Sequence, residues 1–387
     1  MRSFGIVIVC YNRITGLKRL TDSLLRVDYA GRKDVDLIFS IDNSGSNIVE
    51  SFASEFVWPF GQKRIRTFEK RQGLKNHILQ CGDYTKDYDI IAVLEDDIMV
   101  SDSFYNYAYQ AADYYWSDDR IAGISLYGFQ KNWLKWPLRF EPMRLSYDSY
   151  FLRIAQSWGQ VWTTPKWEAF KKWINNNKVF VKEENVPEYI NEWPESSWLK
   201  YHDKYCIVTN KFFIYPYVSL TTNFSDAGTH SNGTTNDHQV ELQFNKRSFV
   251  FSPFNQNAVI YDEYMNRMGL GSYLGIEDSD LTVDFYSTKR TTNRTRYLLT
   301  TRKYDYKIIN TYSLTLRPIE ASVILGMSGR GLYLYDTSLH VKNTDIDYSF
   351  SLNLYSLRTH DFKFLLPLSL KLTVIELFTA IKRRLSI

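Results

Sequence analysis

Cysteine is scarce in this 387-residue chain, and its placement argues against two kinds of site. The three cysteines, Cys10, Cys81 and Cys206, lie far apart, are odd in number and form no Cys-x-x-Cys pair. Neither a disulfide framework nor a zinc site is expected from this arrangement. A reducing compartment, with the protein in the cytoplasm, is the location that the sequence favours.

The chain also lacks long apolar runs and a strong net charge. No run of about eighteen or more uncharged apolar residues occurs, so we expect no transmembrane helix. The apolar run over residues 5–10 is too short for the core of a secretory signal. A formal net charge of +4 and the lack of a recognisable nucleic-acid-binding module give no reason to expect a nucleic-acid partner.

Aromatic residues, by contrast, make up 16% of the chain, and the tryptophans are clustered. Eight of the ten lie in one window: Trp133, Trp136, Trp158, Trp162, Trp167, Trp173, Trp193 and Trp198. Tryptophan fills cores well, and its ring faces also stack on the C–H surfaces of sugars, so both uses stay open for the cluster. Trp133 and Trp136 share a loop with Lys131 and Lys135, and they are the best candidates for sugar contacts.

The first third of the chain alternates apolar strands with segments of helical periodicity. We expect buried strands over residues 4–10, 35–41 and 89–94, with helices between them. This alternation predicts an α/β fold built on a doubly wound, mostly parallel sheet. We expect one domain over residues 1–245, with halves at 1–130 and 131–245. A smaller C-terminal region over 246–387 contains strand-like runs at 307–315, 321–325 and 331–335.

Three adjacent carboxylates, Glu95, Asp96 and Asp97, follow the strand expected at residues 89–94. Ligands of parallel sheets bind beyond the carboxyl ends of the strands. Because neighbouring carboxylates repel one another, a bound cation is the simplest explanation for the cluster. Mn²⁺ and Mg²⁺ prefer oxygen ligands and often share them with substrate phosphates. We therefore expect a Mn²⁺ or Mg²⁺ site, although a solvated turn would have the same composition.

Several motifs at these strand ends resemble one family. Cys10-Tyr11-Asn12-Arg13 follows the first strand, Asp42-Asn43-Ser44 follows the second, and Val93-Leu94-Glu95-Asp96-Asp97 follows the third. The stretches 156–162 and 223–231 fit the same pattern. Together they resemble the GT-A fold of nucleotide-sugar glycosyltransferases. The Glu-Asp-Asp form is similar to the N-acetylglucosaminyltransferase I group and its bacterial relatives.

The resemblance implies a role for each matching residue. It implies that Asp97 binds the metal directly and that a loop carrying a histidine closes over the donor. The residues that it places around the nucleotide-sugar are Asn12, Arg13, Asp42, Arg71, Glu95, Asp96 and His230. UDP is the expected nucleotide, because the group that the sequence resembles uses it.

The resemblance implies that the general base is an aspartate directly after a tryptophan, but no acidic residue directly follows Trp198. Asp203 is the first candidate and Glu195 the second. With one base and one metal site, we expect a single displacement that inverts the anomeric centre. By analogy, the resemblance implies transfer of a hexose or N-acetylhexosamine to a glycan or lipid-linked oligosaccharide acceptor, in bacterial surface polysaccharide synthesis.

The sequence leaves two alternative functions open. It also leaves open whether the protein contacts a membrane. A sugar nucleotidyltransferase would need a glycine-rich phosphate loop, and residues 10–13 contain no glycine. A non-catalytic glycan-binding or membrane-associated scaffold could use the same fold. The basic run at 289–307 and the apolar, basic tail at 364–387 suggest peripheral contact with lipid at the inner face of the plasma membrane, although a solvated face and a docked tail explain them equally well.

Overall fold

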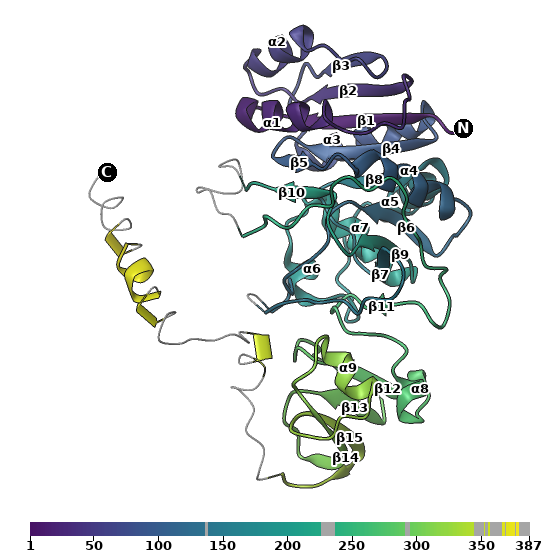
Figure 1. Cartoon of the computed structure of the whole chain (residues 1–387), viewed down its shortest axis with the longest axis vertical. Coiled ribbons are helices and arrows are strands. Elements are labelled where there is room, and N and C mark those ends of the chain that lie inside the picture. Colours follow the sequence, from purple (N-terminus) through teal and green to yellow (C-terminus); the bar gives the residue numbers. More distant parts are fainter. Residues whose placement is uncertain are drawn as a thin grey trace.

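A nine-stranded mixed sheet forms the centre of the computed structural model, which describes residues 1–135, 138–225, 237–290, 295–343, 352, 355–356, 366–367, 369–375 and 377–378 (Figure 1). The strand order is β11-β7-β9-β6-β8-β4-β1-β2-β3. The strands are β1 (Phe4–Cys10), β2 (Val35–Ile41), β3 (Lys63–Thr67), β4 (Ile90–Glu95), β6 (Ile121–Ser125), β7 (Ser149–Leu152), β8 (Gln160–Thr163), β9 (Phe212–Pro216) and β11 (Ile260–Tyr261).

The parallel half of the sheet is made by β4, β1, β2 and β3. Every residue of β1 is buried, as expected for a strand that is covered on both faces. The strand pairs in parallel with β2 on one side and with β4 on the other, so Val9 lies beside both Ser40 and Glu95. The carboxyl ends of these strands therefore meet at one edge of the sheet.

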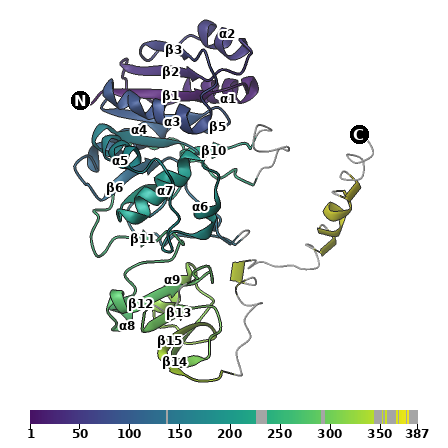
Figure 2. The ribbon, with the colours of Figure 1, turned by 180° about the vertical axis from the view of Figure 1, so that it is seen from behind.

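Helices cover both faces of this sheet, and alternate residues of β1 show which helix packs where. Ile6 and Ile8 belong to a cluster with the apolar residues of α1 (Ile14–Leu24), α2 (Ile48–Glu55) and α4 (Phe104–Tyr114). Val7 and Val9 belong to the other cluster, with α3 (Leu74–Gly82), α5 (Thr164–Asn176) and α7 (Trp198–Val208). In the view from behind, α7 lies across the large sheet with α6 (Glu188–Glu192) beside it (Figure 2).

Two neighbouring helices on that second face approach very closely. An added Cβ at Gly82 would lie 2.0 Å from the ring of Trp167, so no other residue fits at the end of α3 without displacing α5. Three tryptophans of the cluster predicted from the sequence, Trp162, Trp167 and Trp198, are buried in this core. The doubly wound α/β class expected from the sequence is confirmed.

Antiparallel strands widen the sheet beyond β4. The strand β8 pairs antiparallel with both β4 and β6, which leaves β6 parallel to β4. A separate two-stranded ribbon joins β5 (Ile98–Val100), just after the acidic triplet, to β10 (Thr221–Asn223). This ribbon brings residues more than a hundred positions later in the chain next to the end of β4.

The C-terminal region forms a four-stranded sheet in the order β12-β13-β15-β14, and the smaller β-containing unit expected from the sequence is confirmed. Its strands are β12 (Leu281–Asp284), β13 (Tyr297–Thr300), β14 (Tyr306–Ser313) and β15 (Gly331–His340). The run expected as a strand at 321–325 instead lies in α9 (Ile319–Ile324), because a short apolar run fits a buried helix as well as a strand.

The large sheet continues past residue 245, where the sequence placed a boundary. β11 pairs with β7, so residues 260–261 belong to the large sheet. We propose that the boundary lies after this strand and before α8 (Gly271–Leu274).

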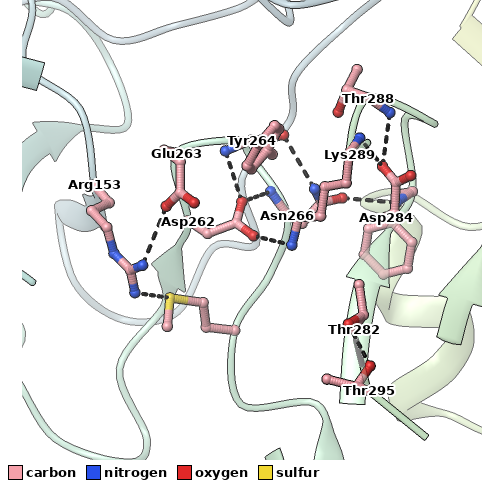
Figure 3. A network of polar contacts seen from close by, with 12 residues as sticks. Arg153, Asp262, Glu263, Tyr264, Asn266, Thr282, Asp284, Thr288, Lys289 and Thr295 are labelled. Atoms are coloured by element: carbon pink, nitrogen blue, oxygen red, sulfur yellow. Dashed lines mark hydrogen bonds and ion pairs between the residues drawn. The ribbon is translucent and has the colours of Figure 1, made fainter. Parts of the chain in front are cut away.

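Charged residues join the two units just beyond β11 (Figure 3). Arg153, after β7, lies 3.2 Å from Glu263, and Lys289 of the C-terminal unit lies 2.7 Å from Asp262. Asp284, at the end of β12, accepts the backbone N–H of Thr288. Buried charges of this kind are costly unless they are paired, and these side chains are paired across the junction.

The basic run predicted at 289–307 is partly neutralised by partners within the protein. Lys289 pairs with Asp262, Arg290 with Glu188, and Arg296 with Asp336 at 3.3 Å. Among the described residues, no helix is long and apolar enough to cross a membrane.

Candidate functional site

The acidic triplet lies at the carboxyl edge of the sheet, on the strand next to β1. Asp96 and Asp97 are 2% and 8% exposed, and Glu95 is only partly buried. Arg13, from the loop after β1, binds both aspartates: its Nη2 lies 2.6 Å from Asp96 Oδ1, and its Nη1 lies 2.7 Å from Asp97 Oδ2. The ends of β1 and β4 are some eighty residues apart in the sequence. They meet here because the two strands pair in parallel.

The charges of this cluster do not balance. Burial, followed by the neighbouring charge of Asp97, raises the pKa of Glu95 to about 8. Burial also raises the pKa of Asp96 to about 6, against the opposing effect of Arg13. Partial burial lowers the pKa of Arg13, but the charges of Asp96, Asp97 and Glu95 outweigh that effect and raise it. One guanidinium thus faces three carboxyl groups, which leaves negative charge that a further cation would neutralise.

A divalent cation fits this cluster. The buried Oδ1 of Asp97 has no hydrogen-bond partner among the described residues, although buried oxygens of this kind are normally satisfied. Over the same residues, no group of three or more His, Cys, Asp or Glu side chains could enclose a metal. An ion bound at Asp97 would therefore take its other ligands from water or from a phosphate-bearing substrate, as Mg²⁺ and similar ions commonly do.

The donor residues predicted at the ends of the neighbouring strands also gather at this edge. Asp42 is 4% exposed and accepts the backbone N–H groups of Gln72 at 2.7 Å and Gly73 at 3.0 Å. Its carboxylate therefore fixes the segment that leads into α3. Arg71, from that segment, lies with its guanidinium 5.1 Å from the centre of the Tyr11 ring. The exposed Asn12 follows Tyr11 directly, so this loop and the 69–73 segment form one surface.

The two candidates for the general base lie in very different places. Asp203 is 1% exposed and accepts the backbone N–H of Ala155 at 2.7 Å, and burial raises the pKa of Asp203 well above its ordinary value. Glu195 precedes α7 and has a largely exposed side chain, and the hydroxyl of Tyr201, followed by Lys200, lowers its pKa. The backbone carbonyl of Glu195 accepts Lys75 Nζ at 3.1 Å. Because Lys75 lies in the first turn of α3, Glu195 is close to the carboxyl edge of the sheet.

A polar residue that was not predicted from the sequence as a site residue also lies beside the triplet. Asn223 of β10 is 2% exposed and pairs with Ile98, and the backbone N–H of Phe224 donates to the carbonyl of Asp97 at 3.1 Å. The Nδ2 of Asn223 has no hydrogen-bond partner among the described residues. The only hint in the sequence was the predicted loop at 223–231, because pairing between β5 and β10 cannot be read from local pattern.

Two predicted contacts fall outside the described residues. His230, expected on the loop that closes over the donor, and Trp136, expected to touch a sugar, both lie there. The remaining predicted residues divide into two groups. Arg13, Arg71 and Asp97 gather at the edge with Asn12, Asp42, Glu95 and Asp96, whereas Asp203 lies in the core.

Comparison with known proteins gives one family and several remote structures. Residues 5–168, under half of the chain, match the family described as Glycosyl transferase family 2. No curated protein matches the chain.

The chain is remotely similar to three solved structures. One is the mannosyltransferase PcManGT from Pyrobaculum calidifontis, in complex with GDP-Man and Mn²⁺ (10% identity, TM-score 0.35, 56% of this chain and 57% of that one). Another is residues 1–349 of TarS from S. aureus (12% identity, TM-score 0.35, 55% and 57%). The third is GalNAc-T7 with UDP, GalNAc and Mn²⁺ (12% identity, TM-score 0.39, 58% and 44%). The chain spans less than two thirds of each, and likenesses this remote assign no activity.

Proposed function

Proceeding from the family match over residues 5–168, we propose that this chain is a metal-dependent glycosyltransferase that uses a nucleotide-sugar donor. The observation that carries the proposal is the buried Glu95-Asp96-Asp97 cluster, which faces a single arginine at the carboxyl edge of the sheet. A cluster with this excess of negative charge is suited to a divalent cation that a diphosphate also ligates. UDP is the favoured nucleotide, because the group that the sequence resembles uses it.

Asp97 would hold the ion through its unpartnered Oδ1 and its backbone-anchored position beside Phe224. When bound, Mn²⁺ or Mg²⁺ supplies positive charge that stabilises the departing diphosphate. Arg13 and Arg71 carry positive charge at the same edge, and we assign them to the phosphates of the donor, although Arg13 is also paired with Asp96 and Asp97. Asn12 and the segment held by Asp42 would contact the nucleoside.

We propose a single displacement with inversion. The acceptor oxygen forms a bond to the anomeric carbon, the bond from that carbon to the diphosphate oxygen breaks, and the nucleoside diphosphate leaves with the electron pair. The hydroxyl proton of the acceptor passes to a carboxylate. We assign this carboxylate to Glu195, whose side chain is largely exposed near the carboxyl edge. Asp203, the first choice from the sequence, is buried and bound to Ala155, so an acceptor cannot reach it.

The acceptor that we propose is a glycan or lipid-linked oligosaccharide of a bacterial surface polysaccharide, used at the inner face of the plasma membrane. The C-terminal helical residues support the membrane contact. Leu366, Leu370 and Phe378 are 62%, 60% and 63% exposed. Over the tail at residues 364–387, four basic residues and one acidic residue give a net charge of +3. An apolar surface next to concentrated positive charge suits an anionic lipid interface.

Release of free nucleotide from sugar donors tests the proposal. The purified chain is incubated with UDP-, GDP-, CDP- and dTDP-sugars in Mn²⁺ or in a chelator, and the released nucleoside diphosphate is measured. We expect release from one nucleotide class, which is lost in the chelator and in Asp97→Asn but kept in Asp22→Asn, a control at an exposed position of α1. If folded protein releases nothing from any donor, with or without added saccharides, the chain is not a glycosyltransferase and a glycan-binding scaffold becomes the better account.

A further inference from the structure

A small aromatic pocket opens on the other side of the acidic triplet from the predicted nucleotide contacts. It is lined by Tyr127, Phe129 and Trp133 from the loop after β6, by Trp158 from the loop before β8, and by residues 237–240. In the sheet order β6-β8-β4-β1-β2-β3, the triplet on β4 lies between this pocket and the loops after β1 and β2. The pocket is therefore separate from the surface that Arg13, Asp42 and Arg71 form.

The walls of the pocket are tryptophans that the core does not bury. Trp133 and Trp158 are half-buried, whereas Trp162, Trp167 and Trp198 of the same cluster are at most 2% exposed. The Trp158 ring lies edge-on to Trp133, with centroids 5.7 Å apart and planes at 74°. The two rings thus form adjoining walls that keep part of their surfaces open. Ligand pockets are lined mainly by apolar and aromatic side chains with a few polar groups among them, and this lining has that composition.

The rim of this pocket is polar. Lys131 lies 3.2 Å from Asp237, and Gln130 and Gln239 also line the opening. His238 lies against Trp158, with ring centroids 4.6 Å apart, and its backbone carbonyl accepts the hydroxyl of Tyr127 at 3.2 Å. Amide, ammonium and carboxylate groups around aromatic walls match a sugar ring, which has apolar C–H faces and hydroxyls around its edge.

The loop that carries Trp133 is held in place by its own hydrogen bonds. Asn132 is 0% exposed, and its Oδ1 accepts the backbone N–H groups of Leu134 at 2.9 Å and Lys135 at 3.1 Å. Its own N–H donates to the carbonyl of Leu138 at 2.7 Å. A preformed loop loses less entropy when a ligand binds, so it can orient one.

The short strand β10 connects the pocket to the triplet. Thr221 donates its hydroxyl to the carbonyl of Trp158 at 2.6 Å, and Thr222 accepts the backbone N–H of Val240 at 2.9 Å. The next residue, Asn223, pairs with Ile98 directly after the triplet. Three consecutive residues of β10 therefore link the pocket walls to the strand that follows the proposed metal ligand.

We propose that this pocket binds a neutral pyranose ring of the acceptor, with Trp133 and Trp158 against its C–H face and Gln130, Lys131 and Gln239 around its hydroxyls. That the bound sugar is the acceptor rests on the proposed function, but the binding of a pyranose can be tested without turnover. Trp133 and Trp158 would position the acceptor and take no part in the chemical step.

Saturation-transfer NMR with methyl pyranosides of glucose, galactose, mannose, N-acetylglucosamine and N-acetylgalactosamine tests the pocket directly. We expect at least one methyl pyranoside to bind the native chain. Binding should weaken roughly tenfold or more in Trp133→Ala, as is typical when a ligand loses an aromatic anchor. Trp116→Ala is the matched control, because Trp116 is partly buried and stacks on Arg2, outside the pocket. Gln130→Ala, at an exposed rim position, tests the pocket without disturbing the loop.

Each outcome has one meaning. Binding that falls in Trp133→Ala and Gln130→Ala but persists in Trp116→Ala supports the pocket. Absence of binding by every methyl pyranoside, or equal binding by Trp133→Ala, overturns it. Nucleotide binding with Mn²⁺ is measured on the same samples. If pyranosides bind and nucleotides do not, the proposed function fails while the pocket stands as a sugar site, and the reverse result rejects the pocket alone.

Discussion

Replacing Glu95 with glutamine should make the metal-free protein more stable at neutral and alkaline pH. In the folded state burial favours the protonated carboxyl group and raises the pKa of Glu95 to about 8 from an ordinary value of 4.5. Below pH 4.5 the protonated carboxyl group contributes its full stabilisation to the folded state. This contribution falls as the pH rises from 4.5 and is lost as the pH rises through 8, because Glu95 of the unfolded chain loses its proton at the lower pH. Glutamine has the same size and cannot ionise, so the variant avoids this loss.

The size of the effect follows from the two pKa values. At about 1.4 kcal/mol for each pH unit, they set an upper limit of about 5 kcal/mol on the loss above pH 8. Part of the Glu95 side chain is exposed to solvent, which reduces the effect, so we expect about 2–3 kcal/mol. The free energies of unfolding of native and variant chains should converge as the pH falls to 4.5.

Urea unfolding across this pH range, in the presence of a chelator, measures the difference. The control is Glu55→Gln, at an exposed position near the end of α2. Added Mn²⁺ should reduce the advantage of Glu95→Gln, because the ion stabilises the native cluster and the variant has lost one of its charges. A stability difference that stays constant with pH would refute the reasoning, since it would mean that ionisation of Glu95 is not its source.

Three further results are expected. Arg13→Met should lower the free energy of unfolding of the metal-free protein by about 1.5–3 kcal/mol, because two buried carboxylates lose their charged partner; a urea midpoint unchanged from the native one would contradict this. If Glu195 takes the acceptor proton, Glu195→Gln should lower kcat by about 100-fold or more in a steady-state assay. Asp203→Asn should leave kcat close to the native value. The reverse ranking would identify Asp203 as the base. Removal of residues 364–387 should abolish sedimentation with vesicles of anionic lipid while nucleotide binding persists; undiminished sedimentation would place the lipid contact elsewhere.

The parts of the fold that local pattern specifies were predictable from the sequence. Continuous apolar runs predicted β1, β2 and β4, whereas the cation at the acidic triplet stays a prediction. Parallel pairing then explains why Arg13 meets Asp96 and Asp97. The sequence placed Arg13 and the triplet at strand ends but did not predict that they pair with each other, because that contact depends on β1 and β4 being neighbours in the sheet.

The parts that depend on tertiary contacts could not be predicted. Asp203, the first candidate for the base, is buried and accepts the backbone N–H of Ala155, and nothing in the sequence indicated that burial. The pairing of β10 with β5 brings Asn223 beside Asp97, and no local pattern shows this. Likewise, composition alone could not separate the core tryptophans, such as Trp162, from those that line the pocket.

The stabilisation of the folded chain by nucleotides, with and without Mn²⁺, tests the central claim most directly. The thermal unfolding midpoint is measured with UDP, GDP, CDP and dTDP for the native chain and for Asp97→Asn. A ligand at about 100 times its Kd adds about 2.7 kcal/mol to the stability of the folded state, which is a readily measured rise in midpoint. We predict such a rise for one nucleotide, only with Mn²⁺ and only in the native chain. An unchanged midpoint with every nucleotide in the presence of Mn²⁺ would contradict the donor site at Asp97.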